Sequence, residues 1–181
     1  MGYTLQIGKK VVDEDYKKDL YNELVEDGCT FEDAEEQSSR IAIKVLDEKI
    51  DTAPAFGEPT DNLNERWPSY SAWSLFTSVT DTEFLFYEKS GEFKGGHPGY
   101  FQITTEWLTD LKHYSQRFKN RYPECIASYD KELDSSNITI EYDTKGNTVP
   151  ANFMICRLEW LEYWAEYALS KYGEDAIFSN T

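Results

Sequence analysis

Apolar residues recur with the spacing of helices in five segments of the chain. From residue 13 to residue 27 they fall every four positions, at Tyr16, Leu20 and Leu24, on one side of a helix. The same kind of pattern predicts helices over residues 30–50, 69–79, 104–121 and 152–172. Each of these helices would bury its apolar face against the rest of the protein.

Alternating apolar and polar residues predict a few short strands. Tyr3–Ile7 alternates with a period of two, Gly8 and Lys9 suit a tight turn, and Val11–Val12 return, so we expect a hairpin. Further strands are predicted over residues 83–87, 137–142 and 176–178. The pattern therefore indicates an α+β fold, with four or five helices packed on a small, mostly antiparallel sheet.

The length of 181 residues suits one compact domain that spans residues 1–181. Within this domain, residues 51–68 are rich in proline, glycine and asparagine and are predicted to form a long loop. Loops of this length in compact domains are usually functional or mobile. Aromatic residues make up 15% of the chain, a share that disordered chains lack, so we expect a folded core.

The charge excludes one large class of function. Acids outnumber bases by 34 to 18, which gives a formal net charge of −16, whereas a direct DNA or RNA binder needs a basic surface. No apolar run is long enough to cross a membrane, and the first residues lack the pattern of a secretory signal, so we expect no membrane association. Three scattered cysteines indicate a reducing compartment, the cytoplasm.

Known catalytic motifs are missing from the sequence. It contains no nucleophile elbow, no phosphate-binding loop and no zinc-binding motif. His97 and His113 stand sixteen residues apart in different predicted elements, which does not indicate a metal site. We therefore expect a protein that has no cofactor or metal and is not an enzyme. A small hydrolase that uses His97 is the enzymatic alternative, because catalytic groups converge in space rather than in sequence.

The acidic residues are unevenly distributed. Residues 13–36 contain eleven acids and two lysines, a net charge of −9, whereas residues 105–123 carry a net charge of +2. On the last predicted helix, three glutamates recur at i, i+3 and i+7, where like charges repel each other. Carboxylates held on rigid helices resemble a row of phosphates and attract a basic partner. The predicted partner-binding residues are Asp13, Glu14, Asp15, Glu32, Asp33, Glu35, Glu36, Glu159, Glu162 and Glu166.

A second constellation combines aromatic residues with a glycine-rich segment around His97. Glycines let a backbone approach a ligand closely, and aromatic rings stack on flat ligands. The residues of this alternative ligand pocket are Trp67, Tyr70, Trp73, His97 and Tyr100, with Arg66 as the partner of a phosphate. Packing of the same rings in a small core is the competing interpretation.

The last predicted helix is apolar around much of its circumference. Beside its expected core face, a second aromatic stripe is formed by Trp160, Tyr163, Trp164 and Tyr167. Such a helix is either central in the fold or half buried in an interface. Because tryptophan and tyrosine are common in interfaces, this stripe is also a candidate for self-association or partner binding.

Three further segments stand out together: residues 57–61 with 64–70, residues 97–99 before a predicted Thr-capped helix, and residues 157–164. Over about half of the chain they resemble small uncharacterised proteins encoded by tailed bacteriophages. The resemblance implies the cytoplasm of an infected bacterium as the compartment. It implies no mechanism, although small acidic phage proteins often inhibit host or defence machinery, some of them by imitating DNA.

The sequence thus supports one leading hypothesis and two alternatives. We expect a non-enzymatic acidic binding protein, an anti-defence or host-takeover inhibitor of the phage type, that occupies the basic cleft of a nucleic-acid-handling protein complex. Its partner would be the basic surface of a host or defence protein. The first alternative is a protein that sequesters a nucleotide or signalling molecule in the aromatic pocket. The second is the hydrolase named above.

Overall fold

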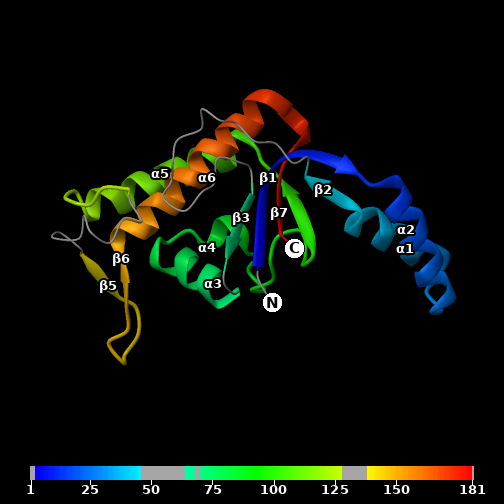
Figure 1. Ribbon diagram of the computed structural model, residues 1–181, viewed down its shortest axis with the longest axis horizontal. Helices are drawn as coiled ribbons and strands as arrows, with labels where there is room; N and C mark the ends of the chain where they lie inside the picture. The colour runs from blue at the N-terminus through cyan, green and yellow to red at the C-terminus, as the bar shows by residue number, and fades with distance from the viewer. Residues whose placement is uncertain (1–2, 46–63, 68–69, 128–137, 181) are drawn as a thin grey trace.

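An antiparallel sheet forms the centre of the protein, and helices pack against it (Figure 1). The structure is a computed structural model. It describes residues 3–45, 64–67, 70–127 and 138–180. The predicted loop at residues 51–68 lies mostly outside the described residues, apart from a short strand near its end.

The central strand of the sheet is β1 (Tyr3–Val12), which has neighbours along both of its edges. Along one edge it pairs with β7 (Ala176–Asn180), which pairs in turn with β4 (Gly99–Gln102). Over its first residues β1 also pairs with β3 (Asn64–Trp67), and over its last residues it pairs with β2 (Ile43–Val45). All of these pairs are antiparallel, which confirms the predicted sheet type.

One uninterrupted strand replaces the hairpin that was expected over residues 3–12, so that prediction is wrong. Gly8 does not turn the chain but pairs with Ile177 of β7. Leu5 and Ile7 are fully buried on the same face of β1. Because neighbouring strands run along both edges, the backbone hydrogen bonds of β1 are satisfied without a return strand.

The helices confirm the α+β class. Those described are α1 (Glu14–Glu26), α2 (Phe31–Ile41), α3 (Tyr70–Val79), α4 (Glu83–Phe86), α5 (Thr105–Arg121) and α6 (Ala151–Tyr172). A 3-10 turn (Gly173–Asp175) joins α6 to β7. A separate hairpin is formed by β5 (Thr139–Glu141) and β6 (Thr148–Pro150).

Two predicted elements differ from the structure. The helix expected over residues 30–50 ends at Ile41, because the β-branched Ile43 and Val45 belong to a strand paired with β1. The strand expected over residues 83–87 is the short helix α4 instead. Leu85 and Phe86 are adjacent in sequence and both buried, an arrangement that one strand on a single-sided core does not provide.

Aromatic rings fill the core between the sheet and the helices. Phe178 of β7 lies 5.2 Å from both Phe101 and Phe86 between ring centroids, and Trp73 of α3 lies 4.7 Å from Phe86. The indole of Trp107 donates a hydrogen bond to the carbonyl of Leu85 at 3.0 Å, so its polar atom is satisfied inside the core. The high aromatic content of the sequence therefore goes mainly into packing.

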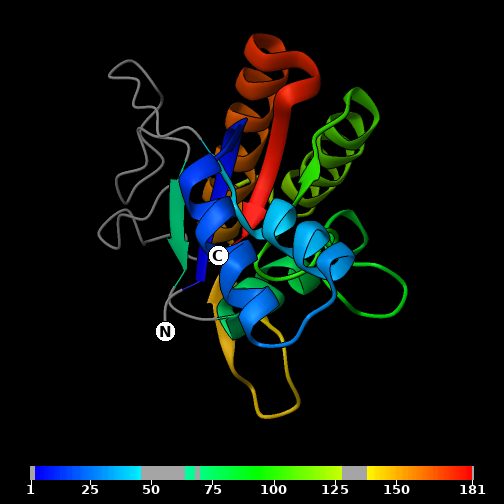
Figure 2. The same cartoon turned by 90° about the vertical axis from the view of Figure 1, so that its right-hand side faces the viewer.

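Two hairpins extend from opposite ends of the long axis, whereas α5 and α6 lie side by side in both views (Figures 1 and 2). The helical hairpin α1–α2 projects from the end where β1 meets β2, and the β5–β6 hairpin projects from the other end. Among the described helices, none is long and apolar enough to cross a membrane. The projecting helical hairpin contains most of the predicted partner-binding acids and is therefore the first candidate for a functional site.

Candidate functional site

The hairpin of α1 and α2, here called the acidic arm, buries very little of its own surface. No residue of α1 is buried, and α2 buries only Ala34 and Ser38. At the base of the arm, the amide of Asp13 donates a hydrogen bond to the carbonyl of Ala42 at 3.0 Å. The arm is therefore attached at its base and exposes most of its length to solvent (Figure 2).

Some of the predicted partner-binding acids also hold the arm in shape. Asp13 caps α1 by accepting a hydrogen bond from the amide of Tyr16 at 3.1 Å. Thr30 and Asp33 form a capping pair, in which the threonine hydroxyl donates to the carboxylate and accepts from the Asp33 amide. Asp13 and Asp33 thus stabilise the ends of these helices, in addition to any contact they make with a partner.

A single ion pair joins the two helices of the arm within the described residues. Lys17 Nζ lies 2.7 Å from Glu35 Oε1. The hydrogen bond from Lys17 holds the pKa of Glu35 below its ordinary value and raises the pKa of Lys17. Glu35 is therefore matched within the chain, and its charge is partly neutralised.

The other acids of the arm remain directed at solvent. Glu14, Asp15, Glu32 and Glu36 are exposed, as a docking surface requires. Asp19 and Glu23 are also exposed, although they were not among the predicted site residues. Their four-residue spacing after Asp15 was the signal, because residues at i, i+4 and i+8 share one face of a helix.

The acidic stripe on α6 has partners within the chain, and its interpretation as a free docking face needs correction. Lys119 Nζ of α5 lies 3.3 Å from Glu159 Oε1 and 3.2 Å from Glu162 Oε1. Lys112 Nζ lies 2.8 Å from Glu166 Oε2. The glutamates tolerate one another because the facing helix supplies cations.

Glu162 is the most enclosed member of this stripe. Its side chain is 22% exposed, compared with 61% for Glu166. It also accepts a hydrogen bond from the hydroxyl of Ser115, a fully buried residue of α5. The acids of α6 and the cations of α5 therefore form ion pairs between these two helices.

The second aromatic stripe of α6 belongs mostly to the core. Trp160 and Trp164 are 1% and 0% exposed, so their proposed role in an interface is wrong. Tyr163 and Tyr167 are half-buried and pack edge-on against Trp164 at 4.9 and 5.4 Å. A helix with eleven buried residues is central in the fold, which was the competing interpretation.

The alternative aromatic pocket is not assembled as proposed. Trp73 is fully buried and packs on Phe178, whereas Tyr100 packs beside Ile177. Because Ile177 and Phe178 are successive residues of β7, these two rings lie on opposite faces of the sheet. The side chains of Arg66, Trp67 and Tyr70 lie outside the described residues.

His97 lies on an exposed loop that β7 holds in place. Its Nδ1 hydrogen bonds with Oδ1 of Asn180, and Nδ2 of the same asparagine donates to the carbonyl of Gly96 at 3.1 Å. The second bond fixes the orientation of the amide, so Nδ1 of His97 is the protonated nitrogen. The glycines of this loop have a packing role, because a Cβ on Gly95 would lie 1.8 Å from the carbonyl oxygen of Tyr100.

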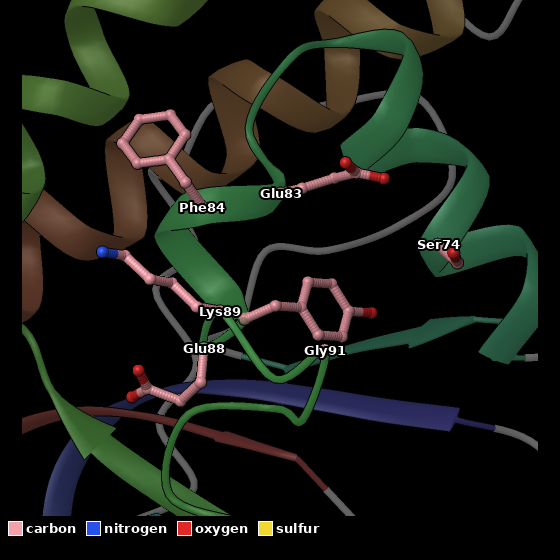
Figure 3. A pocket seen from close by; sticks show the side chains of 7 residues that line it. Ser74, Glu83, Phe84, Glu88, Lys89 and Gly91 are labelled. Atoms are coloured by element: carbon pink, nitrogen blue, oxygen red, sulfur yellow. The ribbon is translucent and has the colours of Figure 1, made fainter.

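Two surface hollows flank the turn that follows α4. The first, of about 400 Å³, is lined by side chains from α3 and α4. Glu83 points towards α3, where Ser74 lies, whereas Phe84 and Lys89 point to the other side of α4 (Figure 3). The second hollow, of about 550 Å³, lies between the end of α2 and the loop that contains His97, and shares Glu88 with the first.

Potential metal ligands do not assemble into a site in the described part of the chain. No group of three or more potential metal ligands converges there. Cys156 is buried in the core, and burial raises the pKa of the Cys125 thiol above its ordinary value. A thiol with a raised pKa is mostly protonated at neutral pH and is a weak nucleophile.

Comparison of the chain with protein-family models, with curated proteins and with solved structures finds no match. The interpretation of function therefore depends on the geometry and the charges described above.

Proposed function

We propose that the protein is a non-enzymatic binding protein whose acidic arm docks on the basic surface of a partner protein. The observation that supports this most strongly is the contrast between two acidic surfaces of the same chain. The acids of α6 are matched by cations of α5, whereas most acids of the arm are exposed and form no ion pair among the described residues.

The arm concentrates the charge of the protein on a surface that the fold does not need to bury. Residues 13–36 carry −9 of the net −16. Asp15, Asp19 and Glu23 follow one another along α1 at intervals of about 6 Å of helix axis. Such a rigid row of charge attracts a basic surface over a distance of about 8 Å, the screening length at physiological salt.

An exposed ring sits beside this charge. Phe31, the first residue of α2, is 71% exposed, the largest fraction among the large hydrophobic residues described. Interfaces commonly place an aromatic residue at the centre of a polar rim. We infer that the turn between α1 and α2 provides an apolar contact and that the helices provide the surrounding charge.

The class of partner follows from the same chemistry. A basic cleft that accepts a row of carboxylates is most common in proteins that handle nucleic acid, where it accepts phosphates. The proposed role is therefore that of an inhibitor, such as a phage-type anti-defence or host-takeover protein, that competes with nucleic acid for the cleft. The exposed acids of the arm are the residues that would make the contact.

The test is a quantitative pull-down from nuclease-treated bacterial lysate. The triple variant Asp15→Asn, Asp19→Asn, Glu23→Gln removes three charges from the arm. The control variant Glu124→Gln, Glu141→Gln, Glu174→Gln removes three exposed charges elsewhere. The captured proteins are eluted in salt steps and identified by mass spectrometry.

We expect the wild type and the control to retain the same nucleic-acid-binding protein, released at moderate salt, and the arm variant to lose it. Added DNA should displace that protein from the wild type. Equal capture by the arm variant, or release that does not depend on salt, would show that the arm is not the docking surface.

A further inference from the structure

The second hollow lies at the base of the acidic arm, where the arm meets the body of the protein. Arg40 in the last turn of α2 forms one wall, and Glu88, Glu92 and the loop with Gly96 and His97 form the others. Its volume of about 550 Å³ lies within the range of small-molecule sites.

Opposite charges line this hollow without neutralising one another. Within the described residues, Arg40 forms no ion pair with Glu88 or Glu92, so their charged atoms lie more than 4.0 Å apart. Among the described residues, the only hydrogen bond of the Glu92 carboxylate is a long contact with the hydroxyl of Ser90, at 3.4 Å. Both signs of charge are therefore available to a third molecule.

The loop accommodates the guanidinium group closely. A Cβ on Gly96 would lie 2.8 Å from a guanidinium nitrogen of Arg40, so the guanidinium group lies close to the loop backbone, and the positive φ of 84° favours glycine at this position. Asn180 holds the same loop by its bonds to Gly96 and His97. The loop that contains Gly96 and His97 is thus held in position beside Arg40 by hydrogen bonds to Asn180 of β7.

We propose that this hollow binds a short zwitterionic peptide or amino acid. The ligand carboxylate would bind the guanidinium fork of Arg40, and its ammonium group would bind Glu88 and Glu92. The two charged ends of an extended dipeptide lie about 7 Å apart, and the charged atoms of Arg40 and the glutamates lie more than 4.0 Å apart, so one dipeptide can contact both walls.

The net charge decides between ligand classes. The three charged side chains of the hollow sum to −1 in a protein of net charge −16, so a phosphate or nucleotide is repelled. A simple amine is attracted by the glutamates but leaves Arg40 unmatched. A zwitterion satisfies both walls and brings no net charge. This site is independent of the docking function proposed for the arm.

The test uses the full chain and three probes that differ only in their ends. These are Ala-Ala, its N-acetylated form, which lacks the ammonium group, and its C-terminal amide, which lacks the carboxylate. Each is titrated to millimolar concentration while the backbone amide signals of Gly95 and Gly96 are followed by NMR. We expect saturable shifts with Ala-Ala and at least about tenfold weaker binding of the other two probes.

Two variants separate binding from folding. Arg40 and Glu92 are exposed, so Arg40→Gln and Glu92→Gln should leave the fold intact and weaken Ala-Ala binding by about tenfold. Lys145→Gln in the distant β5–β6 turn is the control and should bind like the wild type. The proposal is overturned if no probe shifts the loop signals, if the blocked probes bind as well as Ala-Ala, or if Arg40→Gln binds unchanged.

Discussion

Removal of Glu162 tests whether the acidic stripe of α6 is a structural lock. In the variant Glu162→Ala, the fully buried Ser115 loses the acceptor of its hydroxyl, and Lys119 loses one of its two carboxylates. An unsatisfied buried hydroxyl costs about 1–3 kcal/mol, and a partly exposed ion pair contributes about 0.2–1 kcal/mol. We therefore expect the free energy of unfolding to fall by about 2–3 kcal/mol.

Two companion variants separate the contributions. Glu162→Gln keeps an acceptor for Ser115 and removes only the charge, so its cost should be below about 1 kcal/mol. Glu166→Ala removes a pair whose carboxylate side chain is 61% exposed, and its cost should be about 0.5 kcal/mol or less. High salt should reduce the effect of Glu162→Gln, because screening weakens the ion pair, and should leave most of the effect of Glu162→Ala.

Urea unfolding followed by tryptophan fluorescence measures these differences. For a typical slope, a loss of 2 kcal/mol lowers the midpoint by about 1 M urea. If Glu162→Ala is no less stable than Glu166→Ala at an unchanged slope, then the stripe does not lock α5 to α6. In that case Glu159, Glu162 and Glu166 return to the set of available docking residues.

Three further outcomes follow from the structure. Phe31→Ala should leave the unfolding midpoint unchanged, because the ring is 71% exposed, and should weaken capture of the partner in the pull-down described above. Gly95→Ala should lower the free energy of unfolding by more than about 3 kcal/mol, because the added Cβ would lie 1.8 Å from a backbone oxygen. Gly146 has the same kind of positive φ but open space around it, so Gly146→Ala should lower the free energy of unfolding by only about 1–2 kcal/mol. Urea unfolding measures both values. Hydrogen bonds from Asn147 hold the pKa of Asp143 below its ordinary value. The turn formed by residues 143–147 should therefore be intact at a pH above the ordinary pKa of an aspartate and should loosen as the pH falls through the lowered pKa of Asp143. An NMR titration of the Asn147 signals checks this, and signals that titrate at an unshifted carboxyl pKa would contradict it.

Much of the fold was predictable because its signals are local. A capping threonine predicts the start of the helix over residues 104–121, and the observed helix α5 is capped by Thr104. The end of α6 is announced by Gly173, which has a positive φ of 57°. Cap residues and apolar periodicity depend on near neighbours in the sequence, so the helices they define can be predicted without knowledge of the tertiary structure.

The errors occurred where partners distant in sequence decide the structure. From its sequence context Gly8 is predicted to lie in a turn, but it pairs with Ile177 of β7, near the other end of the chain. The apolar pattern of residues 43–45 continues that of the preceding helix, but in the structure these residues pair with β1 as a strand. In both places tertiary pairing overrides the local preference, and no single-sequence pattern reports that pairing.

The candidate site shows the same division and explains why charge runs alone were ambiguous. The run over residues 13–36 and the stripe on α6 look alike in sequence, yet only the second has a basic helix packed against it. The basic excess of residues 105–123 was visible, but which acidic segment it faces depends on the packing of α5 beside α6. Once that pairing is taken into account, the unmatched negative charge lies mainly on the acidic arm. A surface that the fold neither buries nor neutralises costs stability through self-repulsion, and the basic partner proposed above would supply the missing cations.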